Sequence, residues 1–187
     1  MIVYSLREEP EHMKHKLFPI LLALVLLLTG CSAAETEPAP PAAQEFAKAG
    51  IHLTLTEEFY EKEHMGYTTC YLSDDIAVFL LKEEYTLFEN TDFSSASTPE
   101  EYAGLVWNAN QFTGNVPLVT EGNLKYFEYS YSANGNDYTY RTYVFKAADA
   151  FWLVQFASLS DSYDSLKGTM QAYAETVVFD APYTQAQ

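Results

Sequence analysis

The sequence predicts an α+β fold, an antiparallel sheet with helices packed on both of its faces. The segments Ile76–Leu81 and Phe151–Phe156 are apolar on both sides of an extended chain, as in strands that are covered on both faces. Two other segments, Tyr102–Ala109 and Leu166–Val177, place apolar residues three or four positions apart, which is typical of amphipathic helices. Short connections between the expected strands favour antiparallel pairing, and one sheet between two layers of helix buries every apolar face.

Three strands are expected at the start of the domain. In Ile51–Leu55 the apolar residues alternate with polar ones, which indicates a half-buried strand. Tyr67–Leu72 is the second strand. Two residues common in turns, Asp74 and Asp75, lead from it into the apolar strand Ile76–Leu81.

The first helix begins with a capping signal. Thr98 stands at the N-cap, Pro99 at the first helical position and Glu101 at the third, which is the sequence of a capping box. The apolar stripe that follows consists of Tyr102, Leu105, Val106 and Ala109. A short strand at Leu118–Thr120 is expected after this helix.

The last part of the chain is predicted to form a strand, a helix and a short strand. The strand Phe151–Phe156 precedes a helix that starts near Asp161. The apolar stripe of this helix comprises Leu166, Met170, Tyr173 and Val177. Val177–Phe179 is then expected to close the fold as a short strand.

A tyrosine-rich hairpin is expected between the two helices. Six of the twenty residues from Tyr126 to Phe145 are tyrosines, and Asn134-Gly135 among them is the strongest short signal for a type I′ turn. With these two residues at its centre, the turn fixes the register. The pairs on one face are Tyr131 with Tyr138, Tyr129 with Tyr140 and Phe127 with Thr142, and those on the other are Tyr126 with Tyr143, Leu124 with Phe145 and Glu128 with Arg141. The last pair supports the register because it sets the single arginine of residues 32–187 opposite a glutamate.

Residues Met13–Cys31 resemble the signal peptide of a bacterial lipoprotein. Lysines at positions 14 and 16 form a basic start, and the apolar run Leu17–Leu28 is shorter than the roughly 20 residues that span a bilayer. The last four residues, LTGC, are similar to a lipobox. The resemblance implies that Cys31 becomes the mature N-terminus and carries diacylglycerol and, in many bacteria, an amide-linked acyl chain. Two or three chains on one residue make a stable anchor, whereas an ordinary cleaved signal peptide is the alternative interpretation.

The rest of the chain divides by composition. Residues 1–12 fit no part of a signal peptide, and we interpret Met13 as the true start. Residues 32–44 are rich in Ala, Pro and Glu, as in a short, semi-extended tether. Residues 45–182 have the length of a single globular domain, and 183–187 form a tail.

The exported part is strongly acidic. Residues 32–187 contain 7 Lys and Arg against 23 Asp and Glu, a net charge of −16. Such a surface argues against binding to nucleic acid and against adhesion to anionic lipid. It suits solubility near an anionic membrane or a cationic partner, although many secreted bacterial domains are acidic without such a partner.

The order of elements over Phe46–Phe179 resembles that of PsbP-like domains. The likeness lies in AGIHLTLTEEF as an opening strand, TPEEYAGLVWNANQ as a helix, the hairpin, and DAFWLVQFAS followed by a helix. It implies the α-β-α sandwich of the photosystem II extrinsic protein P and its bacterial relatives. The chain is also similar to small Firmicute-type lipoproteins that carry such a domain. No ligand residue of this family matches the sequence, so none is carried over.

The sequence gives few signs of catalysis. It contains no GxSxG elbow, phosphate-binding glycine loop or HExxH helix, and no cofactor or metal is expected. The acidic run from Glu57 to His64 would bind a metal only if its side chains converged, and a solvated loop or helical turn is our interpretation. Cys70, which has no disulfide partner if Cys31 is lipidated, would need His52 or His64 beside it to act as a nucleophile.

Two aromatic features have a packing interpretation and a binding interpretation. Phe151-Trp152 suits a platform for sugar rings, but core packing is favoured in a strand covered on both faces. The tyrosines of the hairpin are interpreted first as sheet packing. If the helices leave that face open, Glu128 and Arg141, flanked by Tyr126 and Tyr143, are the expected ligand site.

These observations predict a non-catalytic binding or accessory module. The domain is expected to be held at the outer face of the cell membrane through lipidated Cys31, with an envelope protein of unknown identity as partner. A small hydrolase-like enzyme and a solute-binding lipoprotein of a transporter are the alternatives. The transporter role is disfavoured because about 140 folded residues are too few for the usual binder of two domains.

The predicted register is tested by exchanging the charges of one pair. Arg141→Glu should destabilise the hairpin by roughly 1 kcal/mol or more, because it places two carboxylates opposite each other. Adding Glu128→Arg should restore part of the free energy of unfolding, measured by urea denaturation. Additive losses in the double variant would contradict the register.

Overall fold

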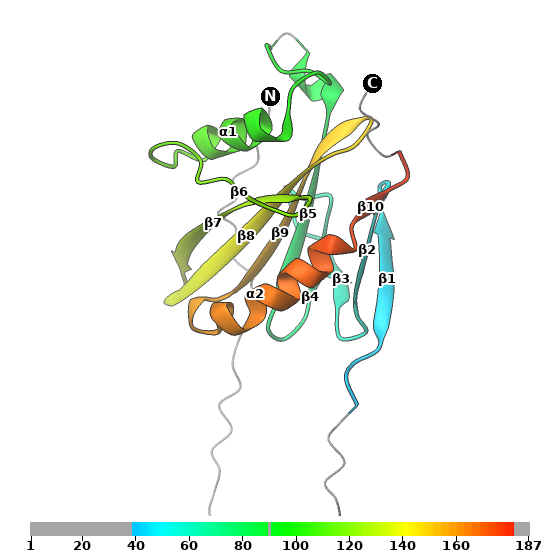
Figure 1. The fold of residues 1–187 in the computed structure, drawn as a ribbon. Helices are drawn as coiled ribbons and strands as arrows, with labels where there is room; N and C mark the ends of the chain where they lie inside the picture. The colour runs from blue at the N-terminus through cyan, green and yellow to red at the C-terminus, as the bar shows by residue number, and fades with distance from the viewer. Residues whose placement is uncertain (1–38, 90, 182–187) are drawn as a thin grey trace, which may run out of the picture.

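The described part of the chain folds around a seven-stranded antiparallel sheet (Figure 1). The computed structural model describes residues 39–89 and 91–181. The predicted signal peptide with Cys31, most of the tether and the tail 183–187 lie outside these residues. Within them, no helix is both long enough and apolar enough to cross a membrane.

The large sheet has the strand order β3-β4-β5-β9-β8-β7-β6, and each neighbouring pair is antiparallel. Its strands are β3 (Tyr60–Lys62), β4 (Thr69–Leu72), β5 (Ala77–Glu84), β6 (Val119–Glu121), β7 (Leu124–Ala133), β8 (Asn136–Lys146) and β9 (Ala150–Leu159). The predicted strands of this sheet are therefore present, and the short strand β3 is an addition within the acidic run.

A second, three-stranded sheet was not predicted. It consists of β1 (Ala43–Lys48), β2 (Ile51–Thr56) and β10 (Val178–Phe179), in the order β1-β2-β10. The opening strand thus does not join the large sheet, because its buried apolar residues pack face-on against that sheet together with the second helix. Since β1 begins at Ala43, the folded domain starts two residues before the predicted boundary.

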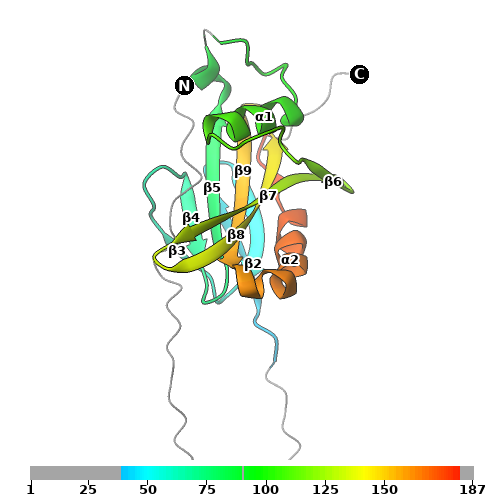
Figure 2. The same cartoon turned by 90° about the vertical axis from the view of Figure 1, so that its left-hand side faces the viewer.

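One helix lies on each face of the large sheet, as the two views in Figures 1 and 2 show, and the predicted fold class is confirmed. Helix α1 (Pro99–Ala109) has the predicted capping box. The amide of Glu101 donates to Thr98 Oγ1 at 3.2 Å, and the amide of Thr98 donates to Glu101 Oε2 at 2.7 Å. On the opposite face, α2 (Ser160–Glu175) packs with the small sheet.

The stripe predicted for α1 is partly wrong. Tyr102 and Val106 are buried as expected, but Ala109 is exposed and Trp107 is buried in its place. The indole is drawn inward because it packs edge-on against Phe127 of β7 at 5.7 Å between ring centroids. A 3₁₀ turn, η1 (Tyr85–Phe88), was also not expected and adds a buried phenylalanine to the same core.

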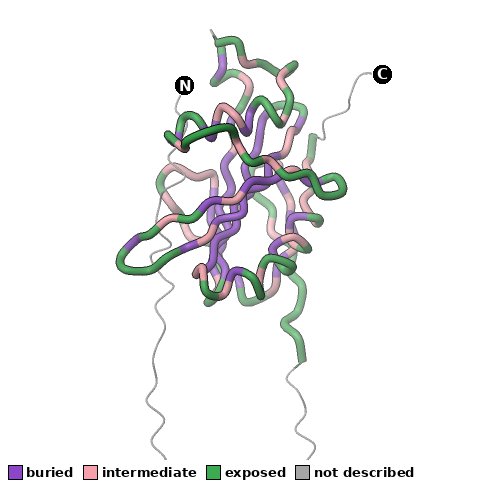
Figure 3. The backbone as a smooth tube through the Cα atoms, turned by 60° about the vertical axis from the view of Figure 1, so that its left-hand side comes forward, coloured by how far each residue is buried: buried purple, intermediate pink, exposed green. Residues whose placement is uncertain are grey.

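The core has two layers, one on each side of the large sheet. Strand β9 belongs to both, since Phe151 and Leu153 face α1 while Trp152 and Val154 face α2. The buried residues follow the central strands in Figure 3, and exposed residues occupy the hairpin tips. Core packing of Phe151-Trp152 is therefore correct, because neither side chain reaches the surface.

The hairpin β7–β8 has the predicted register. Its paired residues run from Tyr126 with Tyr143 to Ala133 with Asn136 and include Glu128 with Arg141, so the predicted pair Leu124 with Phe145 lies just beyond the ladder. Asn134 and Gly135 both have positive φ, 48° and 79°, as a type I′ turn requires.

Two glycine substitutions test what the turn and α2 require of the backbone. Gly135→Ala should lower the free energy of unfolding by roughly 1–2 kcal/mol, because a left-handed backbone disfavours a Cβ atom. Gly168→Ala in α2 should raise it by roughly 0.5–1 kcal/mol, since the added Cβ meets no atom within 4 Å and the helix interior favours alanine. Urea denaturation of both variants measures the two changes, and effects of the same sign would contradict this account.

Candidate functional site

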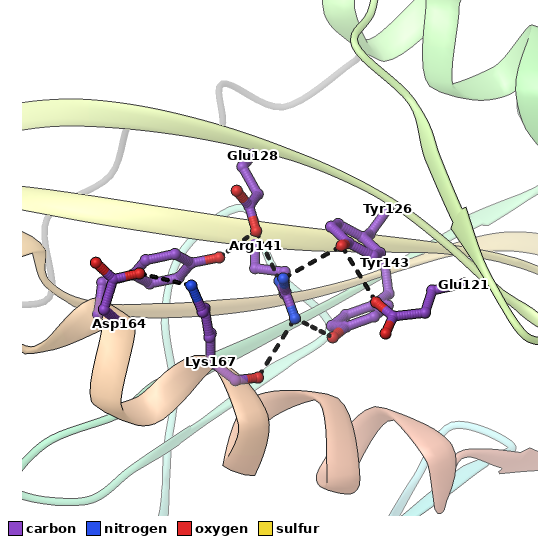
Figure 4. A network of polar contacts seen from close by, with 8 residues as sticks. Glu121, Tyr126, Glu128, Arg141, Tyr143, Asp164 and Lys167 are labelled. Carbon is purple, nitrogen blue, oxygen red and sulfur yellow. Dashed lines mark hydrogen bonds and ion pairs between the residues drawn. The ribbon is translucent and has the colours of Figure 1, made fainter.

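The buried guanidinium of Arg141 joins the hairpin to α2 (Figure 4). Nε donates to Glu128 Oε1 at 2.8 Å, and Nη2 donates to the hydroxyl of Tyr126 at 3.3 Å. Nη1 donates to the hydroxyl of Tyr143 at 3.4 Å and to the main-chain carbonyl of Lys167 at 3.3 Å. Four of the five guanidinium hydrogens are therefore engaged by the protein itself.

The electrostatics of this cluster keep Arg141 charged and its tyrosines neutral. Burial opposes the charge of Arg141, but the hydrogen bonds to Glu128 and Tyr143 outweigh it, and its pKa is raised. Burial raises the pKa of Tyr143 to about 12, although Arg141 acts in the opposite direction. Tyr163 of α2 donates to Glu128 Oε1, and burial raises its pKa as well. The ring of Tyr126 lies 4.2 Å from the guanidinium carbon, a cation–π contact.

The fold brings together the four residues predicted as a ligand site, but it covers them. Arg141 is only 6% exposed, and Tyr126 and Tyr143 are buried beneath α2. The side chain of Glu128 is 38% exposed and is the most accessible of the charged pair. The hairpin face on which a ligand was expected is therefore closed by the helix, and the cluster fixes the position of α2.

A cleft of about 600 Å³ lies beside this cluster, and we call it the α2 cleft. It opens between the β6–β7 turn and the C-terminal end of α2, with β8 forming part of its wall. The residues that line it are Glu121, Gly122, Asn123, Leu124, Phe145, Ala174, Glu175 and Val177. The hydroxyl of Tyr126 donates to Glu121 Oε2 at 3.4 Å, so the cleft adjoins the Arg141 cluster directly (Figure 4).

The α2 cleft combines an apolar floor with a negative rim. Leu124 is buried and Phe145 and Val177 are half-buried, whereas Glu121 and Glu175 are exposed. Within the part of the chain that the structure describes, neither carboxylate forms an ion pair. The last turn of α2 contains no basic residue, so the partial negative charge of the helix end adds to that of the carboxylates.

The acidic run Glu57–His64 does not form a metal site. Glu61 is bound to Lys48 at 2.7 Å and accepts from Thr69 at 2.9 Å, while Glu57 accepts from the amide of Ala42. In residues 39–89 and 91–181, no three carboxylate, imidazole or thiolate groups converge as a metal would require.

The two histidines of the domain lie apart. His52 projects from the polar side of β2, as predicted, with Nδ1 2.9 Å from Glu45 and Nε2 2.7 Å from Asp180. His64 packs edge-on against Phe79, whose cross-strand partner is Cys70. Cys70 is buried in the core layer below α1 and forms no disulfide. His64 thus contacts the cross-strand partner of Cys70, whereas His52 lies on the small sheet.

A buried acid was missed in the sequence. Glu83 is 1% exposed, accepts a hydrogen bond from Tyr102 of α1, and has its pKa raised by burial. Its Oε1 atom has no hydrogen-bond partner among the described residues. The sequence does contain a signal for the burial of Glu83. Phe79, Leu81 and Glu83 occupy alternate positions of one strand, so the third must share the buried face of the first two.

Neither a protein-family model nor a curated protein matches the sequence. The solved structures that are similar to the fold include three named proteins. The solution structure of cyanobacterial PsbP (CyanoP) from Synechocystis sp. PCC 6803 has a TM-score of 0.44 and 12% identity, covering 81% of this chain and 98% of that one. LpqN, involved in cell envelope biogenesis of Mycobacterium tuberculosis, has a TM-score of 0.45 and 18% identity, with 75% and 92% covered.

The third is the Ran-binding protein Mog1p of Saccharomyces cerevisiae, with a TM-score of 0.48 and 10% identity, covering 75% of this chain and 96% of that one. The resemblance to PsbP-like domains is thus found as a similarity of structure at low sequence identity. It concerns the arrangement of strands and helices, and no residue role is taken from these proteins.

The His52 contacts predict a pH-dependent stability. The hydrogen bonds to Glu45 and Asp180 raise the pKa of His52 above its ordinary value of about 6.5. A raised value means that this stabilisation is fully present below the ordinary pKa and is lost as the pH rises through the folded-state pKa. In urea denaturation from pH 5.5 to 9, the advantage of the wild type over His52→Gln should therefore shrink as the pH rises. A constant difference over this range would contradict the contact.

Proposed function

We propose that this protein is a lipid-anchored, non-catalytic binding module at the outer face of the cell membrane, and that its partner binds at the α2 cleft. The observation that carries the proposal is the contrast between two neighbouring places. The Arg141 cluster uses its polar groups within the fold, whereas the α2 cleft presents an apolar floor and two carboxylates without ion-pair partners among the described residues.

The anchor is supported by the lipobox-like sequence that ends at Cys31. Strand β1 begins at Ala43, and a chain spans at most about 3.5 Å per residue. The eleven residues between Cys31 and Ala43, 32–42, therefore reach roughly 40 Å at full extension. A partner of the anchored domain must come to the membrane surface or be a membrane protein itself.

The non-catalytic role is supported by where the reactive groups lie. Glu83, Tyr143 and Tyr163, whose pKa values are raised, all form contacts that hold a helix or strand to the core. The lining of the α2 cleft includes no serine, threonine, cysteine, histidine or lysine. A serine, threonine or cysteine nucleophile with an adjacent histidine or lysine base therefore has no candidate in that lining. The alternative of a solute-binding transporter component is less well supported, because the cleft lies within one domain.

Site-specific photo-crosslinking on intact membranes tests the proposed function. A photoreactive phenylalanine analogue at Asn123, an exposed residue of the cleft rim, should capture a partner protein from membranes of the source cell. The same analogue at Tyr60, which is 50% exposed and outside the cleft, is the matched control. Because the proposed anchor holds the domain at the membrane, a chain in which residues 13–31 are replaced by a cleavable secretory signal without a lipobox should be recovered in the soluble fraction, and the capture should be lost.

Two results would refute the proposed function. One is recovery of the uncrosslinked monomer alone from the Asn123 variant under conditions in which its photoreaction is efficient. The other is a chain with the exchanged secretory signal that, although processed and without Cys31, stays in the membrane fraction, which would contradict the lipid anchor. Equal capture of the same protein from Asn123 and Tyr60 would place the partner elsewhere on the domain.

A further inference from the structure

We propose that the α2 cleft binds a lysine or arginine side chain that a partner protein presents on its surface. The inference rests on the proposed function and specifies its ligand chemistry: a cationic head group on an aliphatic stem. Three features support it, namely the charge of the rim, the apolar floor of the cleft and the positions of the neighbouring cations.

The negative potential of the cleft has three sources. Glu121 projects from the end of β6, Glu175 ends α2, and the carbonyl groups of the last helical turn add their partial charge. The carboxylates come from segments more than fifty residues apart, so the fold, rather than a local acidic run, brings them to one cleft. Glu175 accepts a hydrogen bond from Gln171 at 3.3 Å, which leaves its charge uncompensated.

The nearby cations do not neutralise this rim. Arg141 is paired with Glu128 and lies against the ring of Tyr126. Lys125 is adjacent in sequence to the cleft residue Leu124, but it is bound to Glu100 of α1 at 2.8 Å, on the other side of the sheet. The two glutamates therefore meet an incoming cation without competition from these basic side chains.

The floor of the cleft selects an organic cation over an inorganic one. Leu124, Phe145 and Val177 give an aliphatic stem a surface on which to leave water, and the Phe145 ring adds a face for cation–π contact. The ring of Phe145 is held in place by Phe179, at 5.9 Å between centroids. A bare metal ion would gain nothing from this floor, and no set of three metal-ligating groups is found in the described residues.

The position and charge of the site favour a side chain over a free amino acid. The rim includes the exposed turn residues Gly122 and Asn123, so a stem can enter while its backbone remains outside. A free amino acid would bring its own carboxylate to two glutamates, which repels it. The net charge of −16 also attracts basic protein surfaces and accelerates their association at low ionic strength.

Titration calorimetry of the full mature protein in a non-ionic detergent tests this inference. The probe is an N-acetylated, C-amidated peptide, Ala-Lys-Ala-Lys-Ala, and the same peptide with glutamate for lysine is its charge-reversed control. The lysine peptide should bind and the glutamate peptide should not. Free 1,5-diaminopentane, which carries an ammonium group at each end of the stem and no peptide backbone, should bind no more tightly than the lysine peptide.

Matched variants locate the binding. The double variant Glu121→Gln, Glu175→Gln should bind the lysine peptide at least tenfold more weakly than the wild type does. Asp161→Asn makes the same kind of charge change in the first turn of α2, about 20 Å from Glu175 along the helix, and should change affinity less than twofold. Unchanged urea midpoints for all variants would show that the loss does not come from unfolding.

Several outcomes would overturn the inference. Equal weakening by Asp161→Asn would mean attraction to the overall charge instead of binding in the cleft. Tighter binding of diaminopentane than of the peptide would assign the cleft to a free amine. Absence of binding by every cationic probe would remove the ligand class, while capture of a partner from Asn123 would still support the proposed function. If no cationic probe binds and the Asn123 variant also captures no partner, the two proposals are refuted together.

Discussion

The charge of Arg141 is buried, and that constraint governs the arrangement of the hairpin and α2. A buried cation that loses its partner typically costs roughly 3–5 kcal/mol. The acceptors of Arg141 are distributed over three elements, with Glu128 and Tyr126 in β7, Tyr143 in β8 and the Lys167 carbonyl in α2. A shift of α2 along the sheet would leave a buried donor unmatched. The α2 cleft keeps its shape for the same reason, since one wall is the end of that helix and another is the turn that precedes β7.

The parts of the fold that were predictable depend on contacts close in sequence or on strict periodicity. The capping box at Thr98 and the type I′ turn at Asn134-Gly135 are local, and the turn fixes every pair of the β7–β8 ladder. The small sheet was not predicted because its strands are not all close together in the sequence. Strand β1 buries little beyond Phe46, which packs on Tyr71, and β10 pairs with β2 from the other end of the chain. The short strand at Val177–Phe179 was predicted, but no pattern in the sequence indicated that it pairs with β2.

The candidate site likewise has one part that could be predicted from the sequence and one part that could not. Pairing of Glu128 with Arg141 followed from the register, but the cover that α2 places over them depends on helix packing, which the sequence pattern alone does not position. The α2 cleft combines residues from the β6–β7 turn, β8 and the end of α2, so no continuous motif encodes it. Glu83 is different, since the alternation of Phe79 and Leu81 already assigned it to the buried face. The predicted strand Ile76–Leu81 stopped two residues before Glu83, whereas β5 continues to Glu84.

The pairing of the small sheet gives the domain a direction. Ala43 pairs with Thr56, at one end of β2, and Val178 pairs with His52, near the other end. The chain thus enters the domain at one end of this sheet, the entry end, and leaves it at the opposite end, the exit end (Figure 1). Val177, which lines the α2 cleft, immediately precedes β10 and therefore lies toward the exit end. An anchor attached upstream of Ala43 would hold the molecule by its entry end. The cleft would then face away from the membrane, toward partners that approach from outside the cell.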